Sequence, residues 1–137
     1  MVLVKWDEKK YDVGVKAFNT HHKRLVDIIN LLHSTVDGSN NLNHIAVIYK
    51  ELLDYTKYHF EVEEKLMLKY KYDNYHLQKL EHSKFIDSLT QSYEKFKTEF
   101  YIIELLELID FLGEWILEHI LNTDKKYKEF FEKNGVS

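Results

Sequence analysis

Proline is absent from this 137-residue chain, and only four glycines occur, at Gly14, Gly38, Gly113 and Gly135. A sheet-rich domain normally carries more of these residues, because proline and glycine shape the tight turns between strands. Long helices are therefore favoured. Apolar residues that recur every three or four positions support this interpretation, for example Leu25, Ile29, Leu32 and Val36.

Four stretches carry this helical pattern, and the residues before them do not. Residues 1 to about 18 are expected to form an extended arm anchored by Trp6 and Phe18. Polar caps and breaks at glycine or polar turns mark the ends of the four stretches. Their predicted bounds are, in chain order, Asn19 or Thr20 to Gly38, Asn41 or Asn43 to the KYKYDN segment, Asp73 or Asn74 through Phe96, and about Phe100 to Asn122.

A short amphipathic segment, KKYKEFFEK, follows the fourth stretch and ends at Gly135. Helices of roughly 18–28 residues joined by short polar links become antiparallel neighbours. No repeat or low-complexity tract divides the sequence. The sequence therefore predicts an all-α fold with residues 1–137 in a single domain. We expect an up-down-up-down four-helix bundle with an N-terminal extended arm and a short C-terminal helix.

The composition excludes several classes of function. Nineteen Lys and Arg against 23 Asp and Glu give a net charge of −4, which is unsuited to a nucleic-acid surface. Cysteine is absent, so disulfides, thiolate metal sites and cysteine nucleophiles are excluded. No apolar run approaches the roughly 20 residues of a membrane span, and the first residues lack a secretory signal. We therefore expect a cytoplasmic protein that binds neither nucleic acid nor membranes.

Eight histidines are a high number for a small helical protein, and several lie where a helix face would collect them. Potential metal ligands occur on every predicted helix: His22 on the first, His59 and Glu63 on the second, His82 on the third, and His119 and Asp124 on the fourth. His59 and Glu63 stack on one face, whereas Asp124 is expected at the fraying end of its helix. Converging imidazoles and carboxylates suit first-row metals, and two carboxylates able to bridge indicate two metals.

A structural interpretation competes with the metal site. A single histidine on an apolar stripe is more often a hydrogen-bonded core residue than a ligand, and Glu63 could lie on a solvated face. Joint placement on all four helices nevertheless favours a metal site. Four further histidines fit the pattern less well and are interpreted as structural or exposed: His21, His33, His44 and His76.

These stretches resemble the hemerythrin family, specifically the single-domain bacterial hemerythrins. The resemblance is carried by HHKRL around His22, YHFEVEE around His59 and Glu63, EHSKF around His82, and WILEHILNTDKKY around His119 and Asp124. The amino-terminal VKWDEKKYDVGVKAFN also resembles the arm of that family, so the likeness covers nearly the whole chain.

The resemblance implies a non-haem centre of two iron ions with an oxo or hydroxo bridge. Glu63 and Asp124 would bridge the irons, and His22 and His59 would hold the iron at which dioxygen binds. The other iron would take His82, His119 and a third histidine one helical turn before His82. The resemblance also implies an apolar dioxygen pocket over the iron held by His22 and His59, formed by Phe60, Trp115, Ile116 and Ile120.

The chain departs from the family at the third histidine, because Gln78 stands four residues before His82. A glutamine can bind metal through its amide oxygen, but it is a weaker donor than imidazole. We expect Gln78 to act as a weak ligand or to be replaced there by water. His76 is an alternative ligand, but it is six residues from His82, which turns it about 120° away on a regular helix, so only a local shift or bulge would bring it to the metal. His21 also stands where the family commonly has glutamine, and this difference is expected to alter the hydrogen bonding around the ligands.

The favoured function is dioxygen binding for transport, storage or sensing, and not enzymatic catalysis. We expect the protein to be a monomer or a weak oligomer. One alternative is redox turnover of peroxide, dioxygen or nitric oxide at a loosened di-iron site. Another is a metal-depleted structural bundle. A ferritin-like oxidase is disfavoured because no Glu-x-x-His motif occurs in the chain, and a zinc hydrolase would not require ligands on all four helices.

Overall fold

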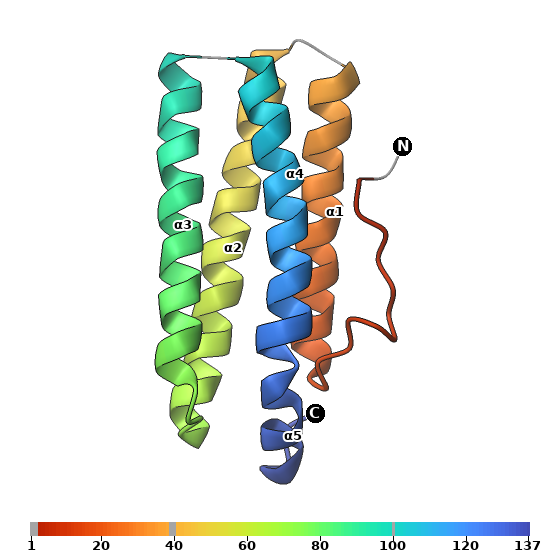
Figure 1. The fold of residues 1–137 in the computed structure, drawn as a ribbon, viewed down its shortest axis with the longest axis vertical. Helices are drawn as coiled ribbons and strands as arrows, with labels where there is room; N and C mark the ends of the chain where they lie inside the picture. The colour runs from red at the N-terminus through yellow and green to blue at the C-terminus, as the bar shows by residue number, and fades with distance from the viewer. Residues whose placement is uncertain (1–2, 39–40, 100) are drawn as a thin grey trace.

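The computed structural model describes residues 3–38, 41–99 and 101–137, and within them every regular element is a helix (Figure 1). Four long helices run alternately up and down, and a short helix follows them. The helices are α1 (Lys16–Gly38), α2 (Leu42–Tyr70), α3 (Tyr75–Thr98), α4 (Ile102–His119), η1 (Ile120–Asp124) and α5 (Lys126–Lys133). The predicted all-α four-helix bundle, with its arm and C-terminal helix, is therefore confirmed.

The first helix begins at Lys16, ahead of the predicted cap at Asn19 or Thr20. The side chain of Asn19 binds the arm instead of capping the helix. It accepts a hydrogen bond from the Val13 amide at 2.9 Å and donates one to Asp12 at 2.8 Å. The arm is correspondingly shorter than expected.

The remaining helix ends follow the sequence more closely. The Asn41 side chain caps α2 by accepting a hydrogen bond from the His44 amide at 3.1 Å. Asn74 occupies the cap position of α3 but makes no capping side-chain bond within the described residues. The predicted start near Phe100 lies outside the described residues, and α4 begins at Ile102. Regular α-helix ends at His119 rather than Asn122, because η1 follows as a turn of π-helix.

The arm packs beside α1 and also contacts α4, and Val4 makes both contacts. Asn30 of α1 pairs with the backbone of Val4, accepting from its amide and donating to its carbonyl, both at 2.8 Å. A Cβ at Gly113 of α4 would lie 2.9 Å from a methyl group of Val4, so only glycine allows this approach. Trp6 is half-buried, whereas Phe18 is buried within α1 rather than in the arm.

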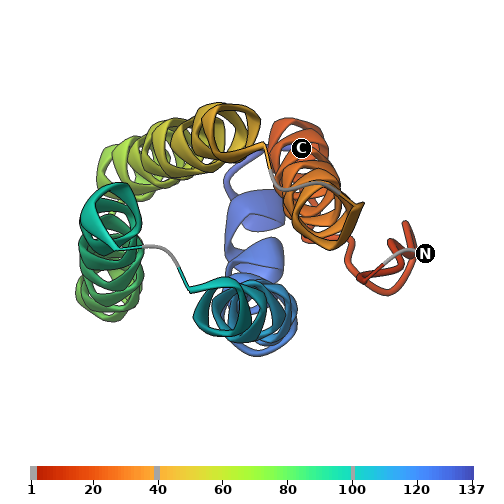
Figure 2. The same cartoon turned by 90° about the horizontal axis from the view of Figure 1, so that it is seen from above.

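Seen from above, the four helices surround the bundle axis, and the chain after α4 crosses beneath them (Figure 2). Phe131 of α5 packs against Phe18 of α1 and Tyr70 of α2, which closes this end of the bundle. The backbone of α3 lies close to α2, and that of α4 close to α1. Between α3 and α4, large side chains span the gap, as in the stacked pair of Phe85 and Trp115.

Candidate metal centre

Six polar side chains from all four long helices and η1 converge in the half of the bundle nearest α5. Each is at most 5% exposed. They are His22 of α1, His59 and Glu63 of α2, His82 of α3, His119 of α4 and Asp124 of η1. Charged groups are rarely buried unless they are paired or bind a metal. The structure thus brings together all six residues that helical spacing had marked as candidates.

The π-helical turn places Asp124 in this cluster. On a regular α-helix, residues five apart point about 140° away from one another, so Asp124 would face away from His119. In a π-turn the hydrogen bonds join residues five apart, which aligns them on one face. The Lys125 amide donates to the Ile120 carbonyl at 3.0 Å in this manner. The expectation that Asp124 lies at a fraying helix end was therefore wrong.

The six side chains form two groups, each with two imidazoles and one carboxylate. The first group is His22, His59 and Glu63, and the second group is His82, His119 and Asp124. In each group, one ligand atom from every residue lies within 4.8 Å of the other two. The Nε2 atom of His59 is 3.0 Å from Glu63 Oε1, and that of His119 is 3.0 Å from Asp124 Oδ1.

Each carboxylate also faces the opposite group. Asp124 Oδ2 lies 3.2 Å from Nε2 of His22, and Glu63 Oε1 lies 3.6 Å from Nε2 of His82. The carboxylates therefore stand between the groups, where their oxygens could serve two cations at once. Carboxylates that bridge metals between facing helices are a recurrent construction in helical bundles.

The donor set fits a metal centre because it is buried, polar and incompletely hydrogen-bonded. Within the described residues, five atoms of the two groups make no hydrogen bond: Nδ1 and Nε2 of His22, Nε2 of His59, Oε1 of Glu63 and Oδ2 of Asp124. Leaving such groups unpaired in a dry core is unfavourable. Nitrogen and oxygen donors of this kind suit divalent first-row metals.

The charges of the two groups depend on one another. Burial would raise the pKa of Glu63, but His59 and His22 hold it well below its usual range. Burial also disfavours protonation of His22, yet contacts with Asp124 and Glu63 raise its pKa to about 9. Burial lowers the pKa of His59. Two carboxylates thus remain ionised at neutral pH, as cation ligands must be.

Three outer partners face the imidazoles, and His21 is the one that the sequence analysis expected to affect the hydrogen bonding around the ligands. His82 Nδ1 lies 2.8 Å from Glu64 Oε2, and His119 Nδ1 lies 3.2 Å from Glu81 Oε2. The third partner is His21, whose Nδ1 lies 2.9 Å from the Nδ1 of His59 and which had been interpreted as structural or exposed. Such partners fix the orientation of a ligand ring.

Tyr127 is a further contact that the sequence analysis did not identify. Its buried hydroxyl donates a 2.6 Å hydrogen bond to Glu63 Oε2. Burial, together with the charges of Asp124 and Glu63, raises the pKa of Tyr127 well above its ordinary value, so it remains a donor. Its position three residues after Asp124 was the available signal, because one helical turn places both on the same face.

Gln78 is fully buried on α3, one turn before His82. Its Nε2 donates a 3.0 Å hydrogen bond to Asp124 Oδ1, and its Oε1 makes none within the described residues. His76, the alternative residue, is exposed. His44 is also exposed, and His33 is half-buried.

The four residues expected to form a dioxygen pocket lie on α2, α4 and η1. Phe60 stacks on His82 with ring centroids 3.7 Å apart, and the half-buried Trp115 stacks on His119 at 4.6 Å. These two rings therefore pack against the second group, although the pocket was expected over the iron of the first. Ile116 and Ile120 are buried.

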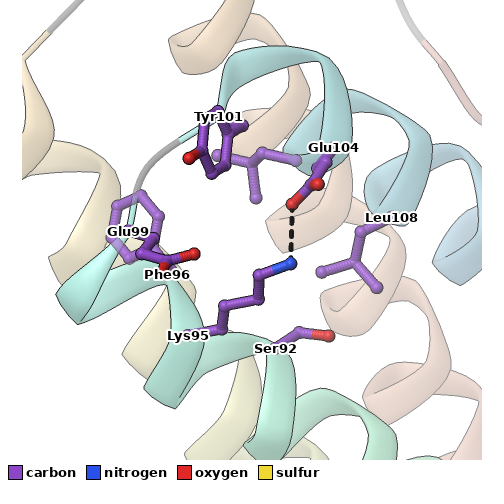
Figure 3. Close-up of a pocket in the computed structure, with 8 residues that line it drawn as sticks. Ser92, Lys95, Phe96, Glu99, Tyr101, Glu104 and Leu108 are labelled. Carbon is purple, nitrogen blue, oxygen red and sulfur yellow. Dashed lines mark hydrogen bonds and ion pairs between the residues drawn. The ribbon is translucent and has the colours of Figure 1, made fainter.

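A separate surface pocket of about 140 Å³ lies at the opposite end of the bundle, between α3 and α4 (Figure 3). An ion pair of 3.0 Å between Lys95 and Glu104 crosses it. Its lining includes Ser92, Phe96 and Tyr101 but none of the histidines. Among the described residues, none of the helices is long and apolar enough to span a membrane.

Comparison with known proteins gives a single family. Residues 13–131 match the family model described as the hemerythrin HHE cation binding domain. The bacteriohemerythrin of Pseudomonas paraeruginosa is 34% identical over 116 residues, which are 85% of this chain and 74% of that protein. The bacteriohemerythrin of Methylococcus capsulatus is 28% identical over 127 residues, covering 93% and 95%.

Solved structures agree with this assignment. A crystal structure of wild-type hemerythrin superposes with a TM-score of 0.85 at 28% identity, covering 93% of this chain and 96% of that one. A single-residue variant of hemerythrin gives 0.87, with 94% and 97% covered. On its matching residues and its fold, the chain belongs to the hemerythrin family.

Proposed function

We propose that this protein is a cytoplasmic non-haem di-iron protein that binds dioxygen for transport, storage or sensing, as a single domain of residues 1–137 and as a monomer or weak oligomer. The observation that carries the proposal is the pair of matched groups that share Glu63 and Asp124. Hemerythrins are oxygen-binding proteins and not enzymes, which agrees with the expected binding role.

In this proposal Glu63 and Asp124 would each bind both irons, with an oxo or hydroxo group between them. His22 and His59 would hold one iron, His82 and His119 would hold the other, and Gln78 would lie beside the second. The crossed distances between carboxylates and imidazoles support this assignment. When bound, the metal pair supplies the electrons and the open position that reversible dioxygen binding needs.

The other side chains position these donors and keep water away. Glu64, Glu81 and His21 hold three imidazoles by their Nδ1 atoms, which leaves each Nε2 directed toward the centre. We propose that Phe60, Trp115, Ile116 and Ile120 wall the dioxygen pocket. An apolar wall of this kind excludes water from a bound ligand.

A second candidate function is redox turnover of peroxide, dioxygen or nitric oxide. Gln78 favours it, because the second group has an amide where the family has an imidazole. A metal-depleted structural bundle is disfavoured by the buried carboxylates, Glu63 and Asp124, which no lysine or arginine contacts among the described residues. Without metal, their charge would be balanced only by protonated histidines, since Tyr127 and Gln78 give them neutral hydrogen bonds.

The testing experiment is elemental analysis of purified protein with optical spectra taken anaerobically, in air and after re-evacuation. Two irons per chain and an oxo-bridged spectrum that appears in air and vanishes reversibly are expected. Irreversible bleaching with two irons would favour redox turnover instead. Failure to retain iron after anaerobic loading would leave the structural alternative.

A further inference from the structure

Gln78 is the member of the site whose chemistry the family pattern does not explain. It is fully buried, and its two polar atoms are used unequally. The nitrogen donates to Asp124 Oδ1 at 3.0 Å, whereas the oxygen makes no hydrogen bond within the described residues. A buried carbonyl without a donor is unfavourable, so this oxygen is suited to a partner that the chain itself does not supply.

The orientation of the amide follows from its neighbour. Gln78 Nε2 lies 3.0 Å from Asp124 Oδ1, and a carboxylate that binds a cation is ionised. An ionised carboxylate only accepts hydrogen bonds, so the amide must present its NH2 to it. Rotating the amide by half a turn would set two acceptors against each other. Gln78 is therefore a donor to Asp124 in this geometry.

The remaining donors divide equally between the two groups. Each group has two imidazoles and a carboxylate, and each is approached by the carboxylate of the other group. A third imidazole would make the second group the richer one, but none is present there among the described residues. His76 is exposed on the same helix and is not part of the cluster.

We propose that Gln78 does not bind the second metal but holds Asp124, and that the metal of the second group keeps an exchangeable position facing Gln78 Oε1. The ligand of that position is a small molecule that donates a hydrogen bond to the carbonyl, with water as the resting occupant. The centre then has one exchangeable position on each metal. This inference rests on the proposed di-iron function.

The imidazoles of the second group lie nearer to solvent than those of the first. His82 and His119 are 2% and 5% exposed, whereas His22 and His59 are fully buried. A surface pocket of about 230 Å³ reaches His82 between α2 and α3. Another of about 160 Å³ reaches His119 between α3 and the end of α4. Small molecules therefore approach the second group more closely from solvent than the first.

The test counts nitric oxide molecules bound to protein loaded anaerobically with two 57Fe(II) ions. Nitric oxide binds an iron at an open or water-filled position, and Mössbauer spectra resolve the two irons. We expect two nitric oxide molecules per chain and changed spectra for both irons. Gln78→His, which adds an imidazole to the second group, is expected to bind one. Gln91→His, at an exposed position on the same helix, is the matched control and should bind two.

Gln78→Leu separates the possibilities if the histidine variant does not fold. It should still bind two nitric oxide molecules, since Gln78 is not a ligand. If the natural chain binds one and Gln78→Leu binds two, Gln78 occupies the position and the inference is overturned. If two irons are retained but every variant binds one, the inference is overturned and the di-iron proposal stands. If the natural chain cannot retain two irons, both proposals fail.

Discussion

The two groups of the centre have the same kinds of ligand but different partners at the outer nitrogens of their imidazoles. In the second group, Glu64 and Glu81 face the outer nitrogens of His82 and His119. In the first group, His59 has only another imidazole, His21, as its outer partner. The outer nitrogen of the fourth ring, His22, makes no hydrogen bond within the described residues. A carboxylate partner makes an imidazole a stronger donor than a neutral partner does. The group that lacks a third imidazole is therefore the group whose two imidazoles both have carboxylates as outer partners.

The largest expected effect comes from removing a carboxylate that both groups share. Glu63→Ala should release metal from both groups, because Glu63 stands 3.0 Å from His59 and 3.6 Å from His82. Metal content should fall before helix content does, as measured by elemental analysis and circular dichroism. Glu61→Ala, on the exposed face of the same helix, is the matched control. Retention of both irons by Glu63→Ala would rule out the bridging role.

The first group should also control the pH dependence of the metal-free protein. Contacts with Asp124 and Glu63 raise the pKa of His22 from 6.5 to about 9 despite its burial. Its protonated form therefore stabilises the fold fully below pH 6.5, and this contribution is lost as pH rises through 9. A shift of this size corresponds to on the order of 3 kcal/mol. The pKa of His119 is also raised, so it acts in the same direction.

Metal reverses the sign of that dependence, because bound histidines must be neutral and acid releases the ions. The melting temperature of the metal-free protein, prepared with a chelator, should fall as the pH rises from 6.5 to 9. The melting temperature of the iron-loaded protein should instead fall as the pH becomes more acidic. His22→Gln should flatten the first trend, and His44→Gln, at an exposed position, should leave it unchanged. Equal melting temperatures with and without iron at every pH would show that metal and fold are not coupled.

The outer partners give a direct test of the difference between the groups. Glu64→Gln keeps the shape of the side chain but removes the charge beside His82, and should weaken metal binding about 10- to 100-fold. His21→Gln should have a smaller effect, because a neutral partner is exchanged for another neutral one. Competition with a chelator of known affinity measures both. A larger loss of metal affinity in His21→Gln than in Glu64→Gln would show that the neutral partner in the first group matters more than the carboxylate partner in the second.

Helical periodicity was sufficient to predict the bundle and the convergence of His22, His59, Glu63, His82 and His119, because both follow from which residues share a helix face. Asp124 was also named as a candidate ligand, but its place in the cluster depends on the π-turn. Periodicity could not predict the π-turn, since the sequence ILNTD contains no signal for a change in helical pitch. It also missed Glu64 and Glu81, because a carboxylate in a charge-rich stretch looks the same whether it contacts solvent or an imidazole. The early start of α1 depended on Asn19 binding the arm, which is a tertiary contact.

The smallest effect is expected at Tyr127, whose hydroxyl donates a hydrogen bond to Glu63, the carboxylate of the first group. Tyr127→Phe removes the 2.6 Å hydrogen bond to Glu63 Oε2 while keeping the ring contacts with Phe18 and Phe131. Loss of a hydrogen bond to a buried charge should lower the free energy of unfolding by about 1–3 kcal/mol. Chemical denaturation measures this, with Tyr58→Phe at an exposed position as control. Since Glu63 serves both groups, nitric oxide binding should change at both irons together; a change confined to one iron would show that Glu63 does not bridge.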